Sequence, residues 1–144
     1  MTFSKILVAI DIDEPDHAFA ALEASRTLNV AQNRAGKIEI IYVRHHLPTS
    51  YDELLTTDFD VQEIEAARQR VAEWTARFEL DGATFSSRRG RVRDEVLDEA
   101  AQIGADLIII GSHQPSLSSR VLGSNAVAIV RNSPISVLIA RQKE

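Results

Sequence analysis

Residues 106–125 read DLIIIGSHQPSLSSRVLGSN, a stretch that predicts a strand, a polar loop and the start of a helix. The run 107–110 is short, apolar and rich in β-branched side chains, and Gly111 ends it, as in a buried parallel strand. After a hydroxyl-rich loop, a helical pattern begins at Gly123, which permits close backbone approach, and Ser124, a favourable N-cap. Such a strand, loop and helix N-terminus can hold an anion such as phosphate. An ordinary β-α connection has the same pattern, because neither a Walker A loop nor Gly-x-Gly-x-x-Gly is present.

The rest of the chain alternates strands with helices. Apolar runs predict further strands at 6–10, 37–43, 83–87 and 135–140. Helical spacing predicts helices at about 15–33, 61–78, 92–103 and 125–132. Residues 44–60 lack a clean period, which predicts an irregular, solvated connection. Strands that alternate with helices require a parallel sheet with right-handed crossovers and helices on both faces.

Two of the predicted helices have a well-defined apolar face. In the helix from residue 61, one stripe holds apolar side chains and the stem of an arginine, which places Trp74 and Phe78 in the core: Val61, Ile64, Arg68, Val71, Trp74 and Phe78. In the next helix the apolar face contains Val92, Val96, Ala100 and Ile103, and Gly104 ends it. Asp13 is predicted to cap the first helix, which Pro15 opens.

Length and composition predict one domain, residues 1–144, with a substantial hydrophobic core. The hydrophobic content of 44% and charged content of 26% are ordinary for a globular protein, and the net charge of −5 argues against general affinity for nucleic acid or anionic membranes. The chain has no cysteine, which excludes disulfides, zinc-thiolate sites and thiol catalysis. No run approaches the ~20 apolar residues of a membrane span, and no signal-peptide pattern opens the chain, so we expect a cytoplasmic protein.

Three motifs together resemble the C-terminal third of the universal stress protein family: Gly-Ser-His at 111–113, Leu-Gly-Ser at 122–124 and SPISVLIAR at 133–141. The nucleotide-binding branch of that family has Gly-x-x-Gly, a spacer and then Gly-Ser or Gly-Thr. In this chain Gln114 replaces the second glycine, and the spacer, 115–122, is shorter. The form Ser-His-x-Pro followed by Leu-Gly-Ser-Asn is similar to a short-loop subgroup of the family.

The resemblance implies a flavodoxin-like (Rossmann-like) α/β domain with five parallel strands in the order 3-2-1-4-5. In such a sheet the ligand crevice opens at the carboxyl ends of the strands, where the strand order reverses. Asp11, after the first strand, and Gly111, after the fourth, would then face each other across it.

The resemblance further implies that the crevice binds ATP or a related adenine nucleotide, with any Mg²⁺ carried by the phosphates. The nucleoside would be held by Asp11 and by the backbone around Ala9, Ile10 and Val43. The phosphates would be held by the loop and the helix start, namely Gly111, Ser112, His113, Gly123, Ser124 and Asn125. An aspartate that only forms the turn after the strand is the alternative for Asp11.

Two other clusters invite a functional interpretation. Adjacent His45 and His46 point to opposite faces of an extended strand, and no nearby carboxylates complete a shell, so we predict no metal site. The arginines at 88, 89, 91 and 93 form the densest positive cluster, which we expect to be solvated surface remote from the phosphates. An acidic partner or a second anion is the alternative there.

The sequence therefore predicts a nucleotide-binding regulatory module of the stress response. No residue is placed as a general base, so we expect at most slow ATP hydrolysis or autophosphorylation, with no dedicated catalytic residue. The last strand, 135–140, should lie at a sheet edge, and the resemblance implies a homodimer or tetramer through it.

Three other classes of protein make different demands on particular residues. A dimeric interaction protein without nucleotide fits Gln114 and the short loop. A receiver domain needs an aspartate after strand three and a lysine after strand five, where this chain has Arg88-Arg89 and Arg141. A flavodoxin needs a phosphate loop after strand one, where Asp11 and Asp13 would repel phosphate.

Overall fold

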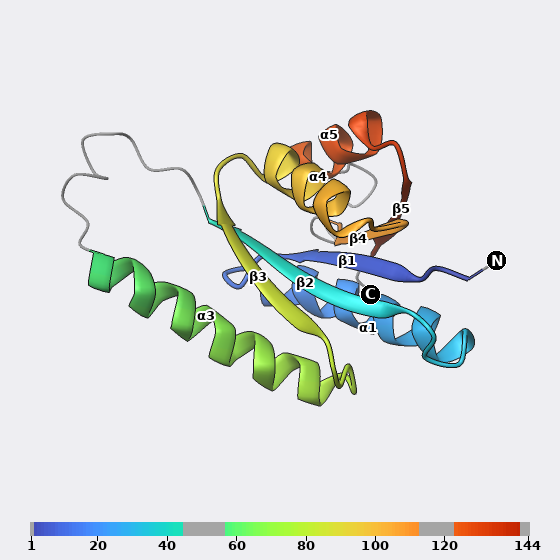
Figure 1. Ribbon diagram of the computed structural model, residues 1–144, viewed down its shortest axis with the longest axis horizontal. Helices are drawn as coiled ribbons and strands as arrows, with labels where there is room; N and C mark the ends of the chain where they lie inside the picture. Colours follow the sequence, from blue (N-terminus) through green and yellow to red (C-terminus); the bar gives the residue numbers. More distant parts are fainter. Residues whose placement is uncertain (1, 45–56, 113–122, 142–144) are drawn as a thin grey trace.

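The computed structural model describes residues 2–44, 57–112 and 123–141, with side chains in the middle range from Asp60 onward. Figure 1 shows a central sheet between two layers of helices. The strands are β1 (Lys5–Ile10), β2 (Lys37–Arg44), β3 (Thr84–Arg89), β4 (Leu107–Gly111) and β5 (Ser136–Ala140). The helices are α1 (Pro15–Ala31), α3 (Thr57–Arg77), α4 (Val92–Ile103) and α5 (Ser124–Asn132).

The sheet is parallel with the order β3-β2-β1-β4-β5, which confirms the predicted fold. Central β1 pairs with β2 on one side and with β4 on the other. At its amino end the carboxylate of Asp106 accepts the backbone N–H of Ser4 at 2.8 Å and of Lys5 at 3.0 Å. Because strand order reverses at β1, a crevice is expected at its carboxyl end, between β1 and β4.

The core is divided by the sheet into two clusters. On the α1 and α3 side, Trp74 and Leu22 pack on β1 and β2, and Phe19 meets Trp74 edge to face with ring centroids 5.2 Å apart. Phe78 packs against the same cluster, so the core prediction for Trp74 and Phe78 is confirmed. On the other side, Val96 of α4 and Ile129 of α5 pack against Leu7, Ile41 and Ile108.

The helix starts differ from the sequence prediction. Glu14, not Asp13, is the N-cap residue of α1, so the capping role predicted for Asp13 is wrong. The turn is made one step earlier, because Asp11 Oδ1 accepts the N–H of Asp13 at 2.9 Å and the Asp11 carbonyl accepts that of Glu14 at 3.2 Å. Gly123 is the N-cap residue of α5 and Ser124 its first helical residue, which also corrects the sequence prediction.

Helix α3 begins earlier and is less buried at its start than predicted. Its bounds are Thr57–Arg77, so part of the expected irregular connection is helical. Val61 is 58% exposed, whereas Val71 and Trp74 are buried. The physical reason is visible in Figure 1, where the first turns of α3 extend past the carboxyl ends of the strands and have no sheet beneath them.

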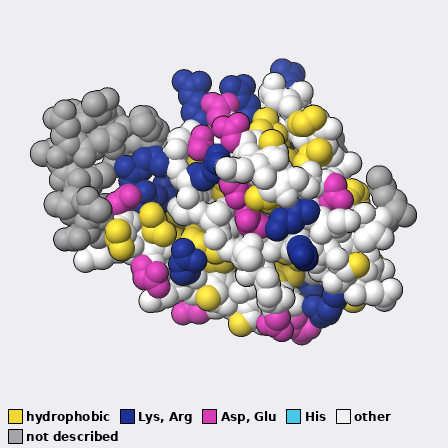
Figure 2. Space-filling model, viewed as in Figure 1, with side chains coloured by type: hydrophobic (Ala, Val, Ile, Leu, Met, Phe, Trp, Pro, Cys, Tyr) yellow, Lys and Arg dark blue, Asp and Glu magenta, His cyan; other side chains and the backbone are white. Residues whose placement is uncertain are grey.

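The arginine cluster is not simply solvated surface. The side chains of Arg88 and Arg89 are each only 25% exposed and lie in ion pairs. Arg88 Nε lies 3.2 Å from Glu99 Oε1 of α4, whereas Arg89 Nη2 donates to Asp60 Oδ1 of α3 at 2.7 Å. Consecutive strand residues point to opposite faces, and here each face meets a helix with carboxylates. Figure 2 accordingly shows acidic and basic side chains interspersed over this side of the molecule.

Candidate functional site

A pocket of about 540 Å³ lies at the carboxyl ends of β1, β2 and β4. Its walls come from the β1–α1 turn, the end of β2, α4 and the start of α5. This is the topological switch point of the sheet, the usual ligand position in this architecture. The volume falls in the range of pockets that hold small-molecule ligands.

The residues predicted to contact the nucleotide gather around this pocket. Those that line it are Ala9, Ile10, Asp11, Val43, Gly111, Gly123, Ser124 and Asn125. Ser112 stands apart, because it is 3% exposed and its N–H donates to the Ala140 carbonyl at 2.7 Å. His113 and Gln114 lie outside the described residues. The two strand exits singled out in the sequence therefore face one cavity.

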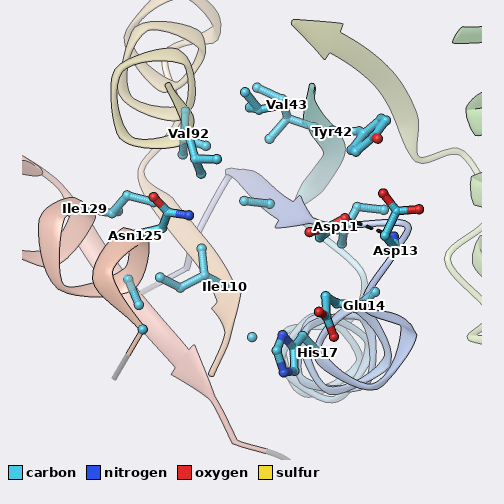
Figure 3. A pocket seen from close by; sticks show the side chains of 18 of the residues that line it. Asp11, Asp13, Glu14, His17, Tyr42, Val43, Val92, Ile110, Asn125 and Ile129 are labelled. Carbon is cyan, nitrogen blue, oxygen red and sulfur yellow. Dashed lines mark hydrogen bonds between the residues drawn. The ribbon is translucent and has the colours of Figure 1, made fainter. Parts of the chain in front are cut away.

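At the exit of β1, the carboxylate of Asp11 is both a turn former and a lining group (Figure 3). One of its oxygens, Oδ1, accepts the Asp13 N–H. A carboxylate has two oxygens and about four acceptor positions. The turn role and a ligand role are therefore compatible in this side chain.

At the exit of β4, Gly111 is required by packing. A Cβ at this position would lie 2.2 Å from the carbonyl oxygen of His17 in α1, far inside van der Waals contact. The first part of α1 can approach the end of β4 only because no side chain separates them. Gly111, which was predicted to bind phosphate, is therefore also required by the packing of α1.

At the start of α5, Ser124 and Asn125 are exposed and line the pocket, and Figure 3 shows Asn125 at its edge. The N–H groups of a first helical turn have no partner within the helix and carry the positive end of its dipole. Gly123 has φ −61° and ψ 155°, a conformation open to any residue. The backbone conformation therefore does not require glycine at this position.

An apolar wall completes the pocket, and none of its residues was predicted to line it. It comprises Ile41, Val92, Val96, Ile110, Ala126 and Ile129. Helix N-termini lie at the same end of a parallel sheet as the strand exits, so the first turns of α4 and α5 border the crevice. Only their position in the topology, and not their residue type, could have indicated that these residues line a pocket. Such a wall suits the flat face of an aromatic ring system.

The opposite rim is polar and also was not predicted, apart from Asp11. Its described members beyond Asp11 are Asp13, Glu14, His17 and Tyr42 (Figure 3). Burial raises the pKa of the Tyr42 hydroxyl, and the nearby carboxylates of Asp13, Asp11 and Glu63 raise it further. Tyr42 therefore remains protonated at neutral pH and can donate a hydrogen bond. Three carboxylates make this rim negative, so an anionic group is better placed near α5.

The described residues provide neither a metal-binding cluster nor a membrane-spanning helix. Within ranges 2–44, 57–112 and 123–141, no three His, Asp or Glu side chains are grouped so as to hold a metal ion. His45 and His46 lie outside these ranges. None of the described helices has the length and apolar character needed to cross a membrane.

Comparison with known proteins gives consistent matches. The sequence model of the universal stress protein family matches residues 2–141. Universal stress protein G of Shigella flexneri is 31% identical over 147 residues, which cover 96% of this chain and 99% of the relative.

Solved structures share the fold over nearly the whole chain. A universal stress protein in complex with cAMP has a TM-score of 0.71 at 17% identity, covering 99% of this chain and 100% of that one. The universal stress protein from Archaeoglobus fulgidus in complex with dAMP has a TM-score of 0.62 at 19% identity, covering 97% and 99%.

Proposed function

The chain belongs to the universal stress protein family, and from this premise we propose that it binds an adenine nucleotide in the pocket between β1 and β4. The observation that carries the proposal is that Asp11 and Gly123, far apart in sequence, line one cavity of about 540 Å³. Two proteins of the same fold bind cAMP and dAMP, which supports this class of ligand.

In the proposed complex, the base lies against the apolar wall, beside the backbone of Ala9, Ile10 and Val43. The Asp11 carboxylate accepts hydrogen bonds from the nucleoside. The phosphates lie at the first turn of α5, where backbone N–H groups and the side chains of Ser124 and Asn125 can donate to them. Base and phosphate thus occupy the apolar and the electropositive ends of the same pocket.

We propose ATP as the nucleotide, with Mg²⁺ carried by its phosphates. The acidic rim supports a role for the cation, because Asp11, Asp13 and Glu14 would repel an uncompensated polyphosphate. Mg²⁺ in nucleotide complexes is held mainly by phosphates, waters and one or two carboxylates. No dedicated metal cage is needed.

We infer a regulatory role in the stress response for the whole chain, residues 1–144, acting as one domain in the cytoplasm. In this role, nucleotide binding would act by changing the stability of the protein or its assembly. Turnover of the bound nucleotide, where it occurs, should be slow, because we assign no general base to the pocket.

Calorimetric titration with ATP, ADP and AMP, each with and without Mg²⁺, tests the ligand. We expect saturable binding at about one site per chain, with ATP strengthened by Mg²⁺. If none of the three binds at millimolar concentration, the nucleotide proposal fails. The alternative, a dimeric interaction protein without nucleotide, would then be the better account.

We also propose that the protein is a homodimer, or a tetramer built from such dimers, through β5. Among the strands that the structure describes, β5 pairs with β4 alone and forms an edge of the sheet. The Ala140 carbonyl accepts the N–H of Ser112, so residues 136, 138 and 140 direct their backbone groups toward β4 and Val137 and Ile139 direct theirs outward. An outward-facing backbone edge is a template for another chain.

Val137→Pro tests the assembly, because it removes an outward N–H and leaves the bonds to β4 in place. Sedimentation at tens of micromolar should give a dimer or tetramer for the parent and a monomer for the variant. A monomeric parent would refute the assembly without bearing on nucleotide binding.

A further inference from the structure

Beneath α4, on the sheet face away from Trp74, lies a cluster of buried and half-buried charged groups. Glu99 of α4 is 8% exposed and is hydrogen-bonded through its side chain to Glu39 of β2. Ser86 Oγ of β3 donates to Glu39 Oε2 at 3.4 Å. Arg88 Nε lies 3.2 Å from Glu99 Oε1. The cluster therefore joins β2, β3 and α4.

A hydrogen bond between two carboxyl groups requires a proton, because an ionised carboxylate only accepts. Arg88 Nε is paired with Glu99 rather than with Glu39. Burial, the hydrogen bond to Glu99 and the negative charge of Glu99 raise the pKa of Glu39, which lies at about 7 instead of 4.5. Lys5 and Ser86 act in the opposite direction.

The other charged groups around this pair are few among the described residues. Lys5 approaches from β1, and Glu95 of α4 lies 3.4 Å from Arg88 Nη1. Gln102 of α4 accepts from Arg88 Nη2 at 2.8 Å. One arginine thus serves two carboxylates of α4, whereas Lys5 is the one cation among the described residues that acts on Glu39.

The cluster is one turn from the nucleotide pocket. Val96, which precedes Glu99 by one helical turn, is fully buried and lines the pocket, as does Val92. On β2, Ile41 and Val43 follow Glu39 on the same face and line the pocket too. Any loosening of α4 from β2 would therefore move one pocket wall.

We propose that Glu39 and Glu99 share one proton, that this proton clamps α4 onto the sheet, and that its loss at rising pH loosens the α4 wall of the pocket. The second part rests on the proposed nucleotide function, and the first does not. A carboxyl with a raised folded pKa takes up a proton on folding. Its stabilising contribution is fully present below about pH 4.5 and is lost as the pH rises through about 7.

The test compares the parent with Glu39→Gln, whose amide donates the same hydrogen bond at every pH. Thermal unfolding without ligand should show the parent losing about 3 °C more than the variant between pH 6 and pH 8. Protection factors of the α4 amides against hydrogen exchange should fall over the same interval in the parent only. Glu65→Gln, at an exposed site on α3, is the matched control and should follow the parent.

The ligand arm measures AMP affinity at the two pH values. The dissociation constant should rise about threefold in the parent, less than the tenfold of one full pKa unit, and stay level in Glu39→Gln. Equal pH slopes for unfolding in parent and Glu39→Gln, or a variant that fails to fold, would overturn the clamp. A clamp seen in unfolding but equal slopes in affinity would overturn its link to the pocket. No AMP binding at either pH would count against the proposed function, while unfolding and exchange still decide the clamp.

Discussion

The exits of β1 and β4 occupy equivalent places in the fold and border one pocket, yet they make opposite demands on the chain. After β1 the chain needs a side chain, because the Asp11 carboxylate accepts the Asp13 N–H and forms the turn. After β4 it needs the absence of one, because the His17 carbonyl occupies the place of a Cβ at Gly111. One exit contributes chemistry and the other allows a helix to approach, so similar motifs at strand exits need not have similar roles.

The largest effect is expected at the exit of β4, where packing requires Gly111. Gly111→Ala places a Cβ against backbone, which cannot move aside as a flexible side chain would, so α1 must shift. We expect a loss of about 3 kcal/mol or more in the free energy of unfolding, at the upper end for overpacking. Denaturant titration measures it.

Gly104→Ala is the matched control for that substitution. Gly104 has φ 68° with no atom within 4 Å of its Cβ position, so alanine there costs only about 1–2 kcal/mol of conformational strain. Equal losses for the two variants would refute the steric role of Gly111.

The second effect separates the two glycines that flank the β4–α5 connection. Gly123→Val puts a branched side chain beside the first-turn N–H groups of α5, where we propose that phosphate binds. Affinity for MgATP should fall by about a hundredfold, which is about 2.7 kcal/mol, while the ligand-free protein stays folded. The affinity of Gly123→Ala for MgATP should lie between those of the valine variant and the parent. An unchanged affinity in both variants would show that the phosphates do not bind at this helix.

The third prediction tests whether Asp11, at the exit of β1, does more than form the turn. Asp11→Ala should weaken nucleotide binding by about 1.5–3 kcal/mol, as for loss of a charged hydrogen-bond acceptor. Asp11→Asn keeps an oxygen that can accept the Asp13 N–H but removes the charge. Calorimetry on the two variants distinguishes the roles, and an alanine variant that binds like the parent would leave Asp11 as a turn former only.

The smallest effect is expected at Asp13. Loss of a true N-cap would cost about 0.5–2 kcal/mol. Because Glu14 holds the cap position, we expect Asp13→Ala to change the free energy of unfolding by less than about 0.5 kcal/mol. A larger loss in urea titration would return the capping role to Asp13.

The fold followed from local pattern, because apolar runs and helical spacing locate the strands and helices and their alternation requires a parallel sheet. Strand order required the family resemblance. The sequence could not predict that Arg88 pairs with Glu99 and Arg89 with Asp60, because neither spacing nor composition indicates which helix covers which face of a strand. Val96 shows the same limit at the site, because one apolar position serves equally for a core contact and for a pocket wall.

The placement of β1 between β2 and β4 has a consequence for synthesis of the chain on the ribosome. Asp106 binds the backbone of Ser4 and Lys5 across 102 and 101 residues. At roughly 5–20 residues per second, β1 waits on the order of 5–20 s for that partner after it is made. During this time the growing chain can pair β1 with β2 but presents the other edge of an apolar strand, Ile6 to Val8, to its surroundings. The nascent chain is therefore most open to edge-to-edge association just before its last third emerges, and that same third completes the pocket.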